Sequence, residues 1–378
     1  MATDSMKALT ELRRKIDAID ERLLRLLNER AKIVRRIGRV KLEQATLPGR
    51  QAGATAGKQV AFHAPQRERE IFQRLERLNK ALGAAFPQDA VQLVFREIIS
   101  ASRALEAPLQ VAYLGPPATF THMACMQHFG LSTGYVPVGS IKEVFNEVER
   151  GRAQYGVVPI ENSTEGVVNH TIDMFIDSPL KIAGEVLQEV SHHLMSIGGK
   201  MPGIKRIYSH PQAIAQCRGW IESNLPGVPV REVYSTARAA ELCKEDSSAA
   251  AIASELAARL YGLQVIKKRI EDNPNNFTRF LIIGQQSPSR SGQDKTSIMF
   301  SIKDRVGALY EMLRIFAESS INLSKIESRP SKKKAWEYVF FVDLEGHTDD
   351  PKVSRAIDKL KEQCLFLKIL GSYPFANR

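Results

Sequence analysis

Hydrophobic residues recur every three or four positions through the first forty residues, which is the spacing of one face of a long α-helix. They are Leu9, Leu12, Ile16, Ile19, Leu23, Leu26, Ile33, Ile37 and Val40. The pattern predicts a helix over about residues 5–44, which at 1.5 Å per residue would span roughly 60 Å. A helix this long has to bury its hydrophobic stripe against other helices or against another subunit.

One position of this stripe is charged, because Arg30 stands where a hydrophobic residue is due. A guanidinium keeps its proton, so inside a helix bundle it needs an anion beside it. Arg13 and Lys41 directly follow stripe residues and border the same face. Three cations along one hydrophobic stripe suggest a bundle that encloses a small polyanion. The alternative is a buried salt bridge for Arg30 and solvated flanks for the other two, and for Arg30 the pattern favours neither.

A loop and a second helix are predicted next. Residues 49–58 are rich in Gly, Ala and Thr, a composition typical of a loop. Pro65 suits the first turn of a helix, because its missing N–H is not needed there. The inward stripe of this helix begins with an ionisable residue, Glu68, and Arg67 stands beside it.

A third helix is predicted over residues 89–106 and completes an all-helical domain over residues 1–106. Ser102 lies on its hydrophobic stripe, and Glu106 follows one helical turn later. All three helices therefore carry polar residues on faces that point inward or border the interior. Because a structural bundle would rarely keep so many, their joint occurrence favours a binding site.

The overall composition is that of a globular protein with two or three domains. The chain has 378 residues, of which 43% are hydrophobic and 25% are charged. No hydrophobic run is long enough to cross a membrane, and the polar first residues are unlike a secretory signal. Four scattered cysteines form no CxxC pair, so we expect reduced thiols and a cytoplasmic location.

The net charge of +11 bears on the kind of partner. A basic surface suits nucleic acid, but the basic residues are spread over predicted helices and are not gathered with aromatic residues on one strand surface. A small anionic substrate explains the charge equally well. We therefore expect neither nucleic acid nor a membrane as partner, and we rank a nucleic-acid binder below the alternatives that follow.

From residue 107 onward, predicted strands and helices alternate, which indicates an α/β domain over residues 107–285 with largely parallel strands. The strands are expected at residues 111–114, 155–160, 204–208, 228–234, 249–253 and 280–283. Ligands of such sheets bind beside strand ends and helix N-termini. Polar clusters stand at four such places, although Ser, Thr and Asn before a helix usually only cap it. The clusters contain Thr119, Asn162 with Ser163, Gln212, and Thr278 with Arg279 and Phe280.

A segment rich in Ser, Gly and Gln at residues 285–294 predicts a linker. Beyond it, residues 295–378 predict the order βαββαβ, the split βαβ arrangement of an α+β domain. Gly307 opens the first helix of this domain, where a glycine permits the close approach of a ligand. From the residues alone, Gly307 is better explained as a plain helix start and Arg329 as a solvated loop residue.

The first domain resembles the all-helical chorismate mutase domain. The residues that carry the resemblance are Leu12, Arg13, Asn28, Glu29, Arg30, Lys41, Arg67, Glu68, Ser102 and Glu106. That family forms an intertwined homodimer in which each pocket borrows an arginine from the other chain. The resemblance implies that Arg13 of the partner subunit, Arg30, and either Arg67 or Lys41 hold the two carboxylates of chorismate.

The same resemblance implies that Lys41 and Glu106 flank the ether oxygen of chorismate, while Glu68 and Ser102 bind hydroxyl or carboxylate groups. The rearrangement needs no nucleophile, so catalysis means holding a compact conformer and stabilising charge on the breaking ether bond. Glu106 would have to be protonated to donate to that oxygen, and we expect the mutase rate to fall as pH rises. Two departures from the family are a longer loop before Arg67 and Ala64, where some members carry an acidic residue.

The second domain resembles prephenate dehydratase along its whole length, most specifically at Glu161 to Ser163 and at Thr278 to Phe280. That family has two lobes of periplasmic-binding-protein type and converts prephenate to phenylpyruvate in the cleft between them. The resemblance makes Thr278 the essential residue, hydrogen-bonded to the departing ring hydroxyl. The residues expected to position prephenate are Thr119, Asn162, Ser163, Gln212, Arg279 and Phe280.

Two features of this site stay open or are expected to be absent. Arg279 is a charge anchor either to a substrate carboxylate or across the lobes. No cofactor is implied, and no metal site is expected, because the side chains of the adjacent His192 and His193 would diverge on a strand.

The third domain resembles the ACT regulatory domain of phenylalanine-sensing enzymes. The matching residues are Gly307, Ala308 and Leu309, together with Glu327, Ser328 and Arg329. The resemblance implies that L-phenylalanine is clamped between subunits and inhibits the enzyme by favouring one of two arrangements.

Together the resemblances imply an enzyme that converts chorismate to prephenate and then prephenate to phenylpyruvate, as a homodimer or larger homo-oligomer. Two alternatives stay open. The helical domain could be degenerate and serve only dimerisation, which the longer loop and Ala64 would support. The chain could instead be a small-molecule sensor without chemistry, which would leave Thr278 and Arg30 unexplained.

Overall fold

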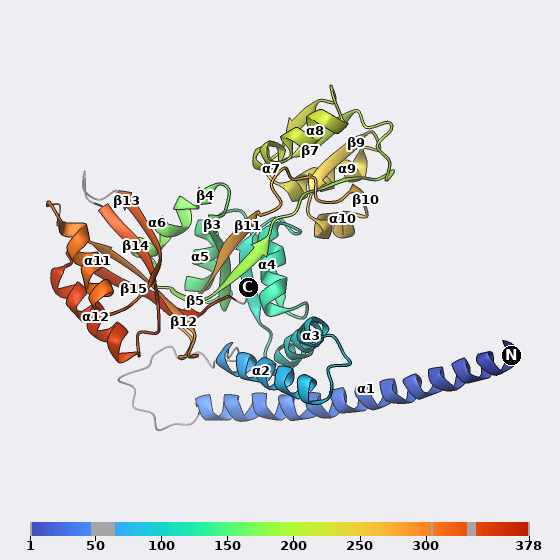
Figure 1. Ribbon diagram of the computed structural model, residues 1–378, viewed down its shortest axis with the longest axis horizontal. Coiled ribbons are helices and arrows are strands. Elements are labelled where there is room, and N and C mark those ends of the chain that lie inside the picture. The colour runs from blue at the N-terminus through green and yellow to red at the C-terminus, as the bar shows by residue number, and fades with distance from the viewer. Residues whose placement is uncertain (1, 47–64, 304, 331–337, 377–378) are drawn as a thin grey trace. The chain divides into compact units, whose positions relative to one another are not determined.

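The computed structural model describes residues 2–46, 65–303, 305–330 and 338–376 (Figure 1). The chain forms two compact units, which are Met1–Leu109 with Phe129–Gly134, and Gln110–His128 with Tyr135–Arg378. The loop predicted at residues 49–58, the longer loop before Arg67 and Ala64 all fall on positions outside the described residues. Within the described ranges, no helix is both long and hydrophobic enough to cross a membrane.

The first unit is all-helical, as predicted. Its helices are α1 (Ala2–Thr46), α2 (Pro65–Ala81) and α3 (Gln88–Glu106). Helix α3 packs against both α1 and α2. The segment 129–134, which belongs to the second domain by sequence, is part of this unit, and its Leu131 N–H donates to the Glu97 carboxylate of α3 at 2.9 Å.

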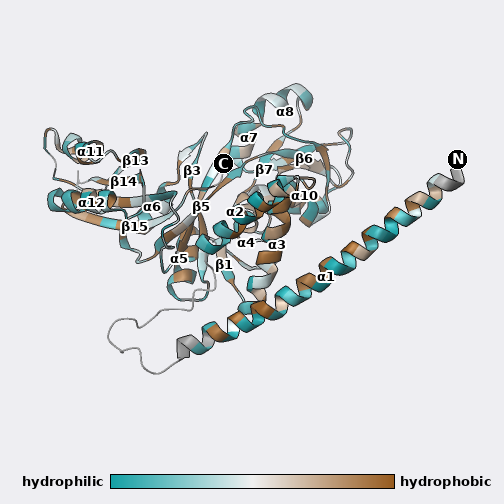
Figure 2. Cartoon of the chain, turned by 60° about the horizontal axis from the view of Figure 1, so that its bottom comes forward, coloured by the Kyte–Doolittle hydropathy of each residue, from teal (hydrophilic) through white to brown (hydrophobic). Residues whose placement is uncertain are grey.

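Most of the stripe predicted on α1 is exposed in the single chain. Brown bands recur along the whole helix in Figure 2, and Leu12 and Leu23 are 56% and 52% exposed. Helix α3 instead covers a neighbouring face of α1, where Val34 is buried and Gly38 approaches Glu106 so closely that an added Cβ would lie 3.3 Å from its Cα. The long helix therefore has two faces suited to burial. Its own chain covers the face that α3 contacts and leaves the predicted hydrophobic stripe mostly exposed.

The second unit begins with two lobes, each built on a mixed sheet. The first sheet has the order β2-β1-β3-β11-β5, with β4 paired to β3, and the second has the order β10-β6-β9-β7-β8. The strands of the first are β1 (Gln110–Leu114), β2 (Gly134–Val138), β3 (Tyr155–Asn162), β4 (Gly166–Val167), β5 (Lys181–Glu189) and β11 (Phe277–Gly284). Those of the second are β6 (His193–Ser196), β7 (Arg206–Ser209), β8 (Val230–Glu232), β9 (Ala249–Ala253) and β10 (Gln264–Lys267). The chain crosses between the sheets twice, after β5 and after β10, which confirms the two-lobed prediction.

Helices flank both sheets. They are α4 (Phe120–Phe129), α5 (Ile141–Glu149), α6 (Asn169–Asp177), α7 (Pro211–Gln216), α8 (Arg218–Asn224), α9 (Thr236–Glu245) and α10 (Glu255–Tyr261). Capping residues define several starts, because the side chains of Ser140, Ser235 and Ser254 each accept a backbone N–H of the first turn. Cys217 separates α7 from α8.

The prediction of largely parallel strands is wrong for these sheets. The pairs β1–β3, β7–β8 and β7–β9 are parallel, whereas β11 runs antiparallel to both β3 and β5, and β6 runs antiparallel to β9 and β10. The parallel pairs are joined through helices, which made their strands easy to predict. The antiparallel strands β5, β6 and β11 lie next to the crossings between the lobes, where the alternation with helices stops.

The last part of the second unit is the predicted βαββαβ domain. Its elements are β12 (Asp294–Ser301), α11 (Ala308–Glu318), β13 (Leu323–Pro330), β14 (Tyr338–Glu345), α12 (Pro351–Gln363) and β15 (Phe366–Pro374). The strands form an antiparallel sheet of order β13-β14-β12-β15. Asp294 was predicted to end a linker, but it is buried in β12 and accepts hydrogen bonds from Ser291 and Gly292.

Strands β12 and β14 of this third sheet are buried on both faces. Helices α11 and α12 cover one face, where Phe300 and Val342 join the hydrophobic core (Figure 1). On the other face Phe341 shares a core with Leu281 of the first lobe. Strand β15 passes so close to β5 that a Cβ added at Gly371 would lie 2.2 Å from the carbonyl oxygen of residue 182. The sheet therefore packs directly on the back of the first lobe.

Candidate active sites

Arg30 is the charged centre of the helical unit. Its Nη1 donates to the Ser102 hydroxyl and, at 3.5 Å, to the carbonyl oxygen of Ile98. Ser102 in turn donates to the same carbonyl at 2.6 Å. These partners are neutral, so within the described residues no carboxylate compensates the Arg30 guanidinium. The structure therefore does not support the alternative of a plain buried salt bridge for Arg30.

Lys41 and Glu106 form a pair beside this arginine. The Lys41 Nζ lies 2.7 Å from Glu106 Oε2, and the Glu106 side chain is 12% exposed. The close approach of Gly38 to α3 brings the two side chains together.

The remaining residues expected in this site are not all gathered in one chain. Glu68 pairs with Arg103 at 3.2 Å, and Arg103, which is 6% exposed, also donates to the carbonyl oxygen of Phe129 at 2.6 Å. Arg67 is 65% exposed and pairs with Glu70. Arg13 is exposed on α1. A single chain thus assembles four of the expected side chains and leaves two arginines at its surface.

Sequence reasoning missed Arg103. It follows Ile99 by four residues and precedes Glu106 by three, so it lies on the buried face of α3. The neighbouring hydrophobic residue Leu105 is 39% exposed, so hydrophobicity alone does not mark the buried face. The signal in the sequence was the helical spacing of Arg103 from Ile99 and from Glu106, which places this charged residue on the same face as both.

A cavity of about 330 Å³ lies between the two lobes of the second unit. It is lined by strand ends and helix starts of both sheets, and Thr119, Asn162, Gln212 and Thr278 are among its lining residues. Four of the expected dehydratase residues therefore meet in one place. Such a volume suits one small molecule.

Thr278 and Asn162 are directly opposite each other on β11 and β3. The Asn162 amide Nδ2 donates to Thr278 Oγ1 at 2.8 Å, and both residues are 9% exposed. Asn162 Oδ1 accepts the backbone N–H groups of Thr164 and Glu165 at 2.9 and 3.0 Å. Because backbone N–H groups can only donate, they fix the orientation of the amide. The Asn162 amide therefore positions Thr278, and both its oxygen and its nitrogen already have partners in the chain.

Thr119 and Gln212 line the cavity from the starts of two helices. Thr119 Oγ1 donates to the carbonyl oxygen of Leu114 and accepts the N–H of His122, each at 3.3 Å. The N–H of Gln212 lies in the first turn of α7, where the His210 ring caps it at 3.3 Å. Burial lowers the pKa of His210, so this cap is a neutral ring at neutral pH.

Three expected substrate residues lie outside the cavity lining. Ser163 is exposed and staples its loop to the start of β11, donating to the carbonyl oxygen of Asn275 and accepting the N–H of Phe277. Phe280 is 2% exposed in the core. Arg279 points to the opposite face of the sheet from Thr278, as the alternation of a strand requires.

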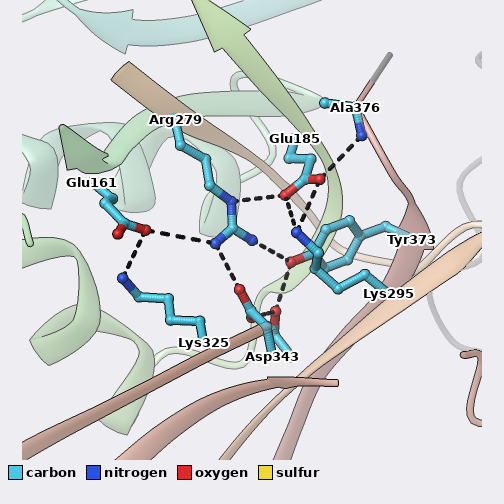
Figure 3. Close-up of polar contacts among 9 residues, drawn as sticks. Glu161, Glu185, Arg279, Lys295, Lys325, Asp343, Tyr373 and Ala376 are labelled. Carbon is cyan, nitrogen blue, oxygen red and sulfur yellow. Dashed lines mark hydrogen bonds and ion pairs between the residues drawn. The ribbon is translucent and has the colours of Figure 1, made fainter. Parts of the chain in front are cut away.

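Arg279 is the centre of a buried ionic cluster (Figure 3). Its Nε lies 2.7 Å from Glu185 of β5, its Nη1 lies 2.6 Å from Asp343 of β14, and its Nη2 donates to the Tyr373 hydroxyl at 3.1 Å. Burial alone would raise the pKa of Glu185, but Arg279 and Lys295 outweigh it and lower that pKa. The guanidinium joins the first lobe to the third sheet, which differs from the expected contact across the two lobes.

Strand β13 makes two further ionic contacts with the first lobe. Lys325 lies 2.7 Å from the Glu161 carboxylate, which also lies 4.0 Å from Arg279 (Figure 3). Arg329 lies 3.3 Å from Asp173 of α6. Both cations belong to the edge strand of the third sheet. One of these two contacts therefore falls on Glu161, the residue that directly precedes Asn162 in β3.

The segment expected to bind an amino acid is divided between α11 and β13. Gly307 has φ +81°, a conformation that favours glycine, and directly precedes α11. Ala308 is buried, whereas Leu309 is 36% exposed. Glu327 and Ser328 lie on β13 next to Arg329, and strand alternation places Glu327 and Arg329 on one face and Ser328 on the other.

Groups of three or more His, Cys, Asp or Glu that could hold a metal ion do not occur among the described residues. His192 and His193 do point apart. The His192 ring meets the Gln216 amide oxygen at 2.9 Å, and the His193 ring accepts the N–H of Arg269 at 2.9 Å.

Comparison with known proteins adds independent evidence for each part of the chain. Family models match residues 12–107 as chorismate mutase type II, residues 111–288 as prephenate dehydratase and residues 296–362 as the ACT domain. A bifunctional chorismate mutase/prephenate dehydratase of Aquifex aeolicus is 53% identical over 372 residues, which are 98% of this chain and 99% of that protein.

Two solved structures resemble the chain over about seven-tenths of its length. One is a prephenate dehydratase of Arthrobacter aurescens in complex with L-Phe, with 36% identity and a TM-score of 0.66 over 70% of this chain and 90% of that one. The other is a quorum-quenching acylase, with 31% identity and a TM-score of 0.65 over 71% of this chain and 98% of that one. The full-length match, in the same domain order, shows that the chain belongs to the family of bifunctional chorismate mutase/prephenate dehydratases.

Proposed function

We propose that α1, α2 and α3 form the chorismate mutase site, with Arg30 as its main anion-binding group. The observation that carries this proposal is the uncompensated guanidinium of Arg30 against a hydroxyl and a carbonyl. A carboxylate of chorismate would supply the missing charge. Lys41 and Glu106 would lie at the ether oxygen, where Lys41 stabilises the charge that develops as the bond breaks. Arg13 would come from the partner subunit.

The dehydratase reaction belongs in the cavity that Thr278 lines. Prephenate loses its ring hydroxyl and its ring carboxylate together. The C–O bond breaks and the departing oxygen takes a proton from the solvent and leaves as water. The electron pair of the broken C–C bond completes the aromatic ring, and carbon dioxide departs. A threonine hydroxyl is too weak an acid to supply that proton outright at neutral pH. It can stabilise the leaving oxygen by a hydrogen bond, because Thr278 Oγ1 already accepts from Asn162 and its own proton is free to donate.

The third sheet is proposed to bind L-phenylalanine and to reduce the activity of the dehydratase. Gly307, Ala308 and Leu309 would provide one wall of the effector site, and Glu327, Ser328 and Arg329 the other. The contacts of β13 with Glu161 and Asp173 give this site a route to the first lobe. The chain would act as a cytoplasmic homodimer or larger homo-oligomer, with domains at residues 1–106, 107–285 and 295–378.

The test uses the full chain and measures chorismate loss and phenylpyruvate formation separately. Arg30→Met is expected to remove mutase turnover and keep the conversion of added prephenate, and Thr278→Ala is expected to do the opposite. L-phenylalanine should inhibit only the formation of phenylpyruvate from prephenate in the wild-type chain. If either substitution removed both activities from a folded chain, the proposal of two separate sites would be wrong. An inactive mutase in the wild-type chain would favour the dimerisation-only alternative.

A further inference from the structure

Asn276 is a buried amide that none of the roles above uses. It is 1% exposed and stands immediately before β11, in the second crossing between the lobes. Its carbonyl oxygen accepts the N–H of Val190 from the first crossing at 2.8 Å. The residue is therefore held where the two connections between the lobes lie against each other.

The Asn276 side chain joins residues of both lobes. Its Oδ1 accepts from Asn162 Nδ2 at 2.8 Å, and its Nδ2 donates to Gln216 Oε1 at 2.9 Å. Asn162 ends a strand of the first sheet, and Gln216 ends α7 beside the second sheet. Asn162, Gln216 and Thr278 all line the cavity. One buried amide thus connects opposite walls of the site.

The direction of every hydrogen bond in this chain of amides is fixed from both ends. At one end, backbone N–H groups fix Asn162 as described, so its NH₂ faces Asn276 and Thr278. At the other end, Gln216 Nε2 donates to the Glu165 carboxylate at 3.2 Å. Gln216 Oε1 is then an acceptor, and it receives both Asn276 Nδ2 and the His192 ring at 2.9 Å. The side chain at position 276 therefore has to accept on one side and donate on the other, as the Asn276 amide does.

We propose that Asn276 is a positioning residue of the dehydratase: it holds Asn162 and Gln216 in register across the cavity, and through Asn162 it keeps the Thr278 hydroxyl as a donor to the leaving oxygen. This inference rests on the proposed dehydratase site. It assigns Asn276 no contact with substrate. Its effect should therefore fall on kcat more than on the KM for prephenate.

Asn276→Asp tests the directionality, because the substitution preserves shape and changes only the donor. An ionised aspartate still accepts from Asn162 but places a second lone pair against Gln216 Oε1. A protonated aspartic acid restores the donor. We expect kcat at neutral pH to fall about 10- to 100-fold, the loss typical of one unsatisfied buried hydrogen bond, with KM changed less than about threefold. As the pH is lowered, the ratio of variant to wild-type kcat should rise.

Matched variants separate this effect from a loss of folding. Asn275→Asp makes the same change one position earlier, where the side chain is exposed, and should keep wild-type kcat at every pH. Gln216→Glu, which turns a carboxyl oxygen toward Glu165, should lose kcat and recover in acid like Asn276→Asp. The mutase rate and the thermal midpoint of each variant report whether the chain is folded.

The outcomes distinguish this inference from the proposed site itself. Acid recovery of both variants, with Asn275→Asp unaffected, supports the inference. It is overturned if Asn276→Asp has wild-type kcat, or if a folded variant loses kcat to the same extent at all pH values. If Asn276→Asp gives either of these results while Thr278→Ala is inactive, the inference is wrong but the proposed dehydratase site still holds. If Thr278→Ala keeps full dehydratase turnover, both the proposed site and the inference are wrong.

Discussion

Replacing Arg279 by methionine tests whether this residue is a structural anchor or a substrate ligand. The Arg279 side chain is 10% exposed, and its guanidinium contacts Glu185, Asp343 and Tyr373 (Figure 3). Methionine keeps much of the volume and removes the charge. Two carboxylates then stay behind in the interior, where an unpaired charge is costly.

Glu185 and Asp343 differ in how many of their polar contacts they would lose with Arg279. Glu185 keeps Lys295 at 3.0 Å and the backbone N–H of Ala376 at 3.0 Å. Asp343 is fully buried, and besides Arg279 it contacts the neutral hydroxyl of Ser297, which donates to Asp343 Oδ1. Removing one member of a buried pair costs about 3–5 kcal/mol, and Asp343 should account for most of it. Arg279→Met together with Asp343→Asn should therefore cost less than the sum of the single changes, by about 1–3 kcal/mol.

Urea unfolding followed by tryptophan fluorescence measures this effect. Trp220, one of the two tryptophans of the chain, belongs to the second unit. We expect a lower midpoint for Arg279→Met, partial recovery in the double variant, and an unchanged KM for prephenate in whatever fraction is folded. An unchanged midpoint together with a KM raised tenfold or more would refute the reasoning and make Arg279 a ligand of a substrate carboxylate.

Three further predictions follow from the same structure. Lys325→Met, which removes the contact with Glu161, should weaken inhibition by L-phenylalanine several-fold without changing uninhibited kcat; a full response in dose–response assays would exclude this route. Burial lowers the pKa of His192 and His193 in the folded chain. Below about pH 6.5 the unfolded chain therefore binds more protons than the folded chain. The free energy of unfolding should fall on acidification by up to about 1.4 kcal/mol per pH unit for each histidine. A urea midpoint that is higher at pH 5.5 than at pH 7.5 would contradict this prediction. Leu23→Asp on the exposed stripe of α1 should dissociate the proposed dimer in sedimentation experiments and abolish mutase turnover, because the proposed mutase site takes Arg13 from the partner subunit. A monomeric wild-type chain would refute this prediction.

The sequence predicted the helical unit and the third sheet well, because their signals are local. Helical spacing, Pro65 and the βαββαβ order depend on neighbours within a few turns. The long helix α1 shows the limit of such signals. The hydrophobic spacing predicts one buried face, but the face against α3, where Val34 and Gly38 lie, is a second one. Periodicity alone does not say which partner covers which face.

Long-range ionic pairing explains what the sequence did not predict. Strand β5 carries Glu185 in the middle of a buried run, and its partners Arg279 and Lys295 are 94 and 110 residues away. Asp343 is 64 residues from Arg279. A strand with an interior carboxylate has no clear alternation of polar and hydrophobic positions, and nothing local signals the compensating charge. For the same reason Arg279 could not be assigned from its neighbours.

The start of β11 decides how the neighbours Thr278 and Arg279 are to be understood. With the strand predicted from Phe280, both residues fall in a loop, and both could face the ligand. The strand begins at Phe277, so its period of two residues sends Thr278 to the cavity and Arg279 to the opposite face. Strand β3 repeats the arrangement, because Asn162 lies opposite Thr278 and Glu161 lies opposite Arg279. The proposed catalytic residue Thr278 and the anchoring residue Arg279 thus lie on opposite faces of one strand pair. A shift of the third sheet that moves Arg279 would reach Thr278 across a single peptide unit, about 3.8 Å between Cα atoms.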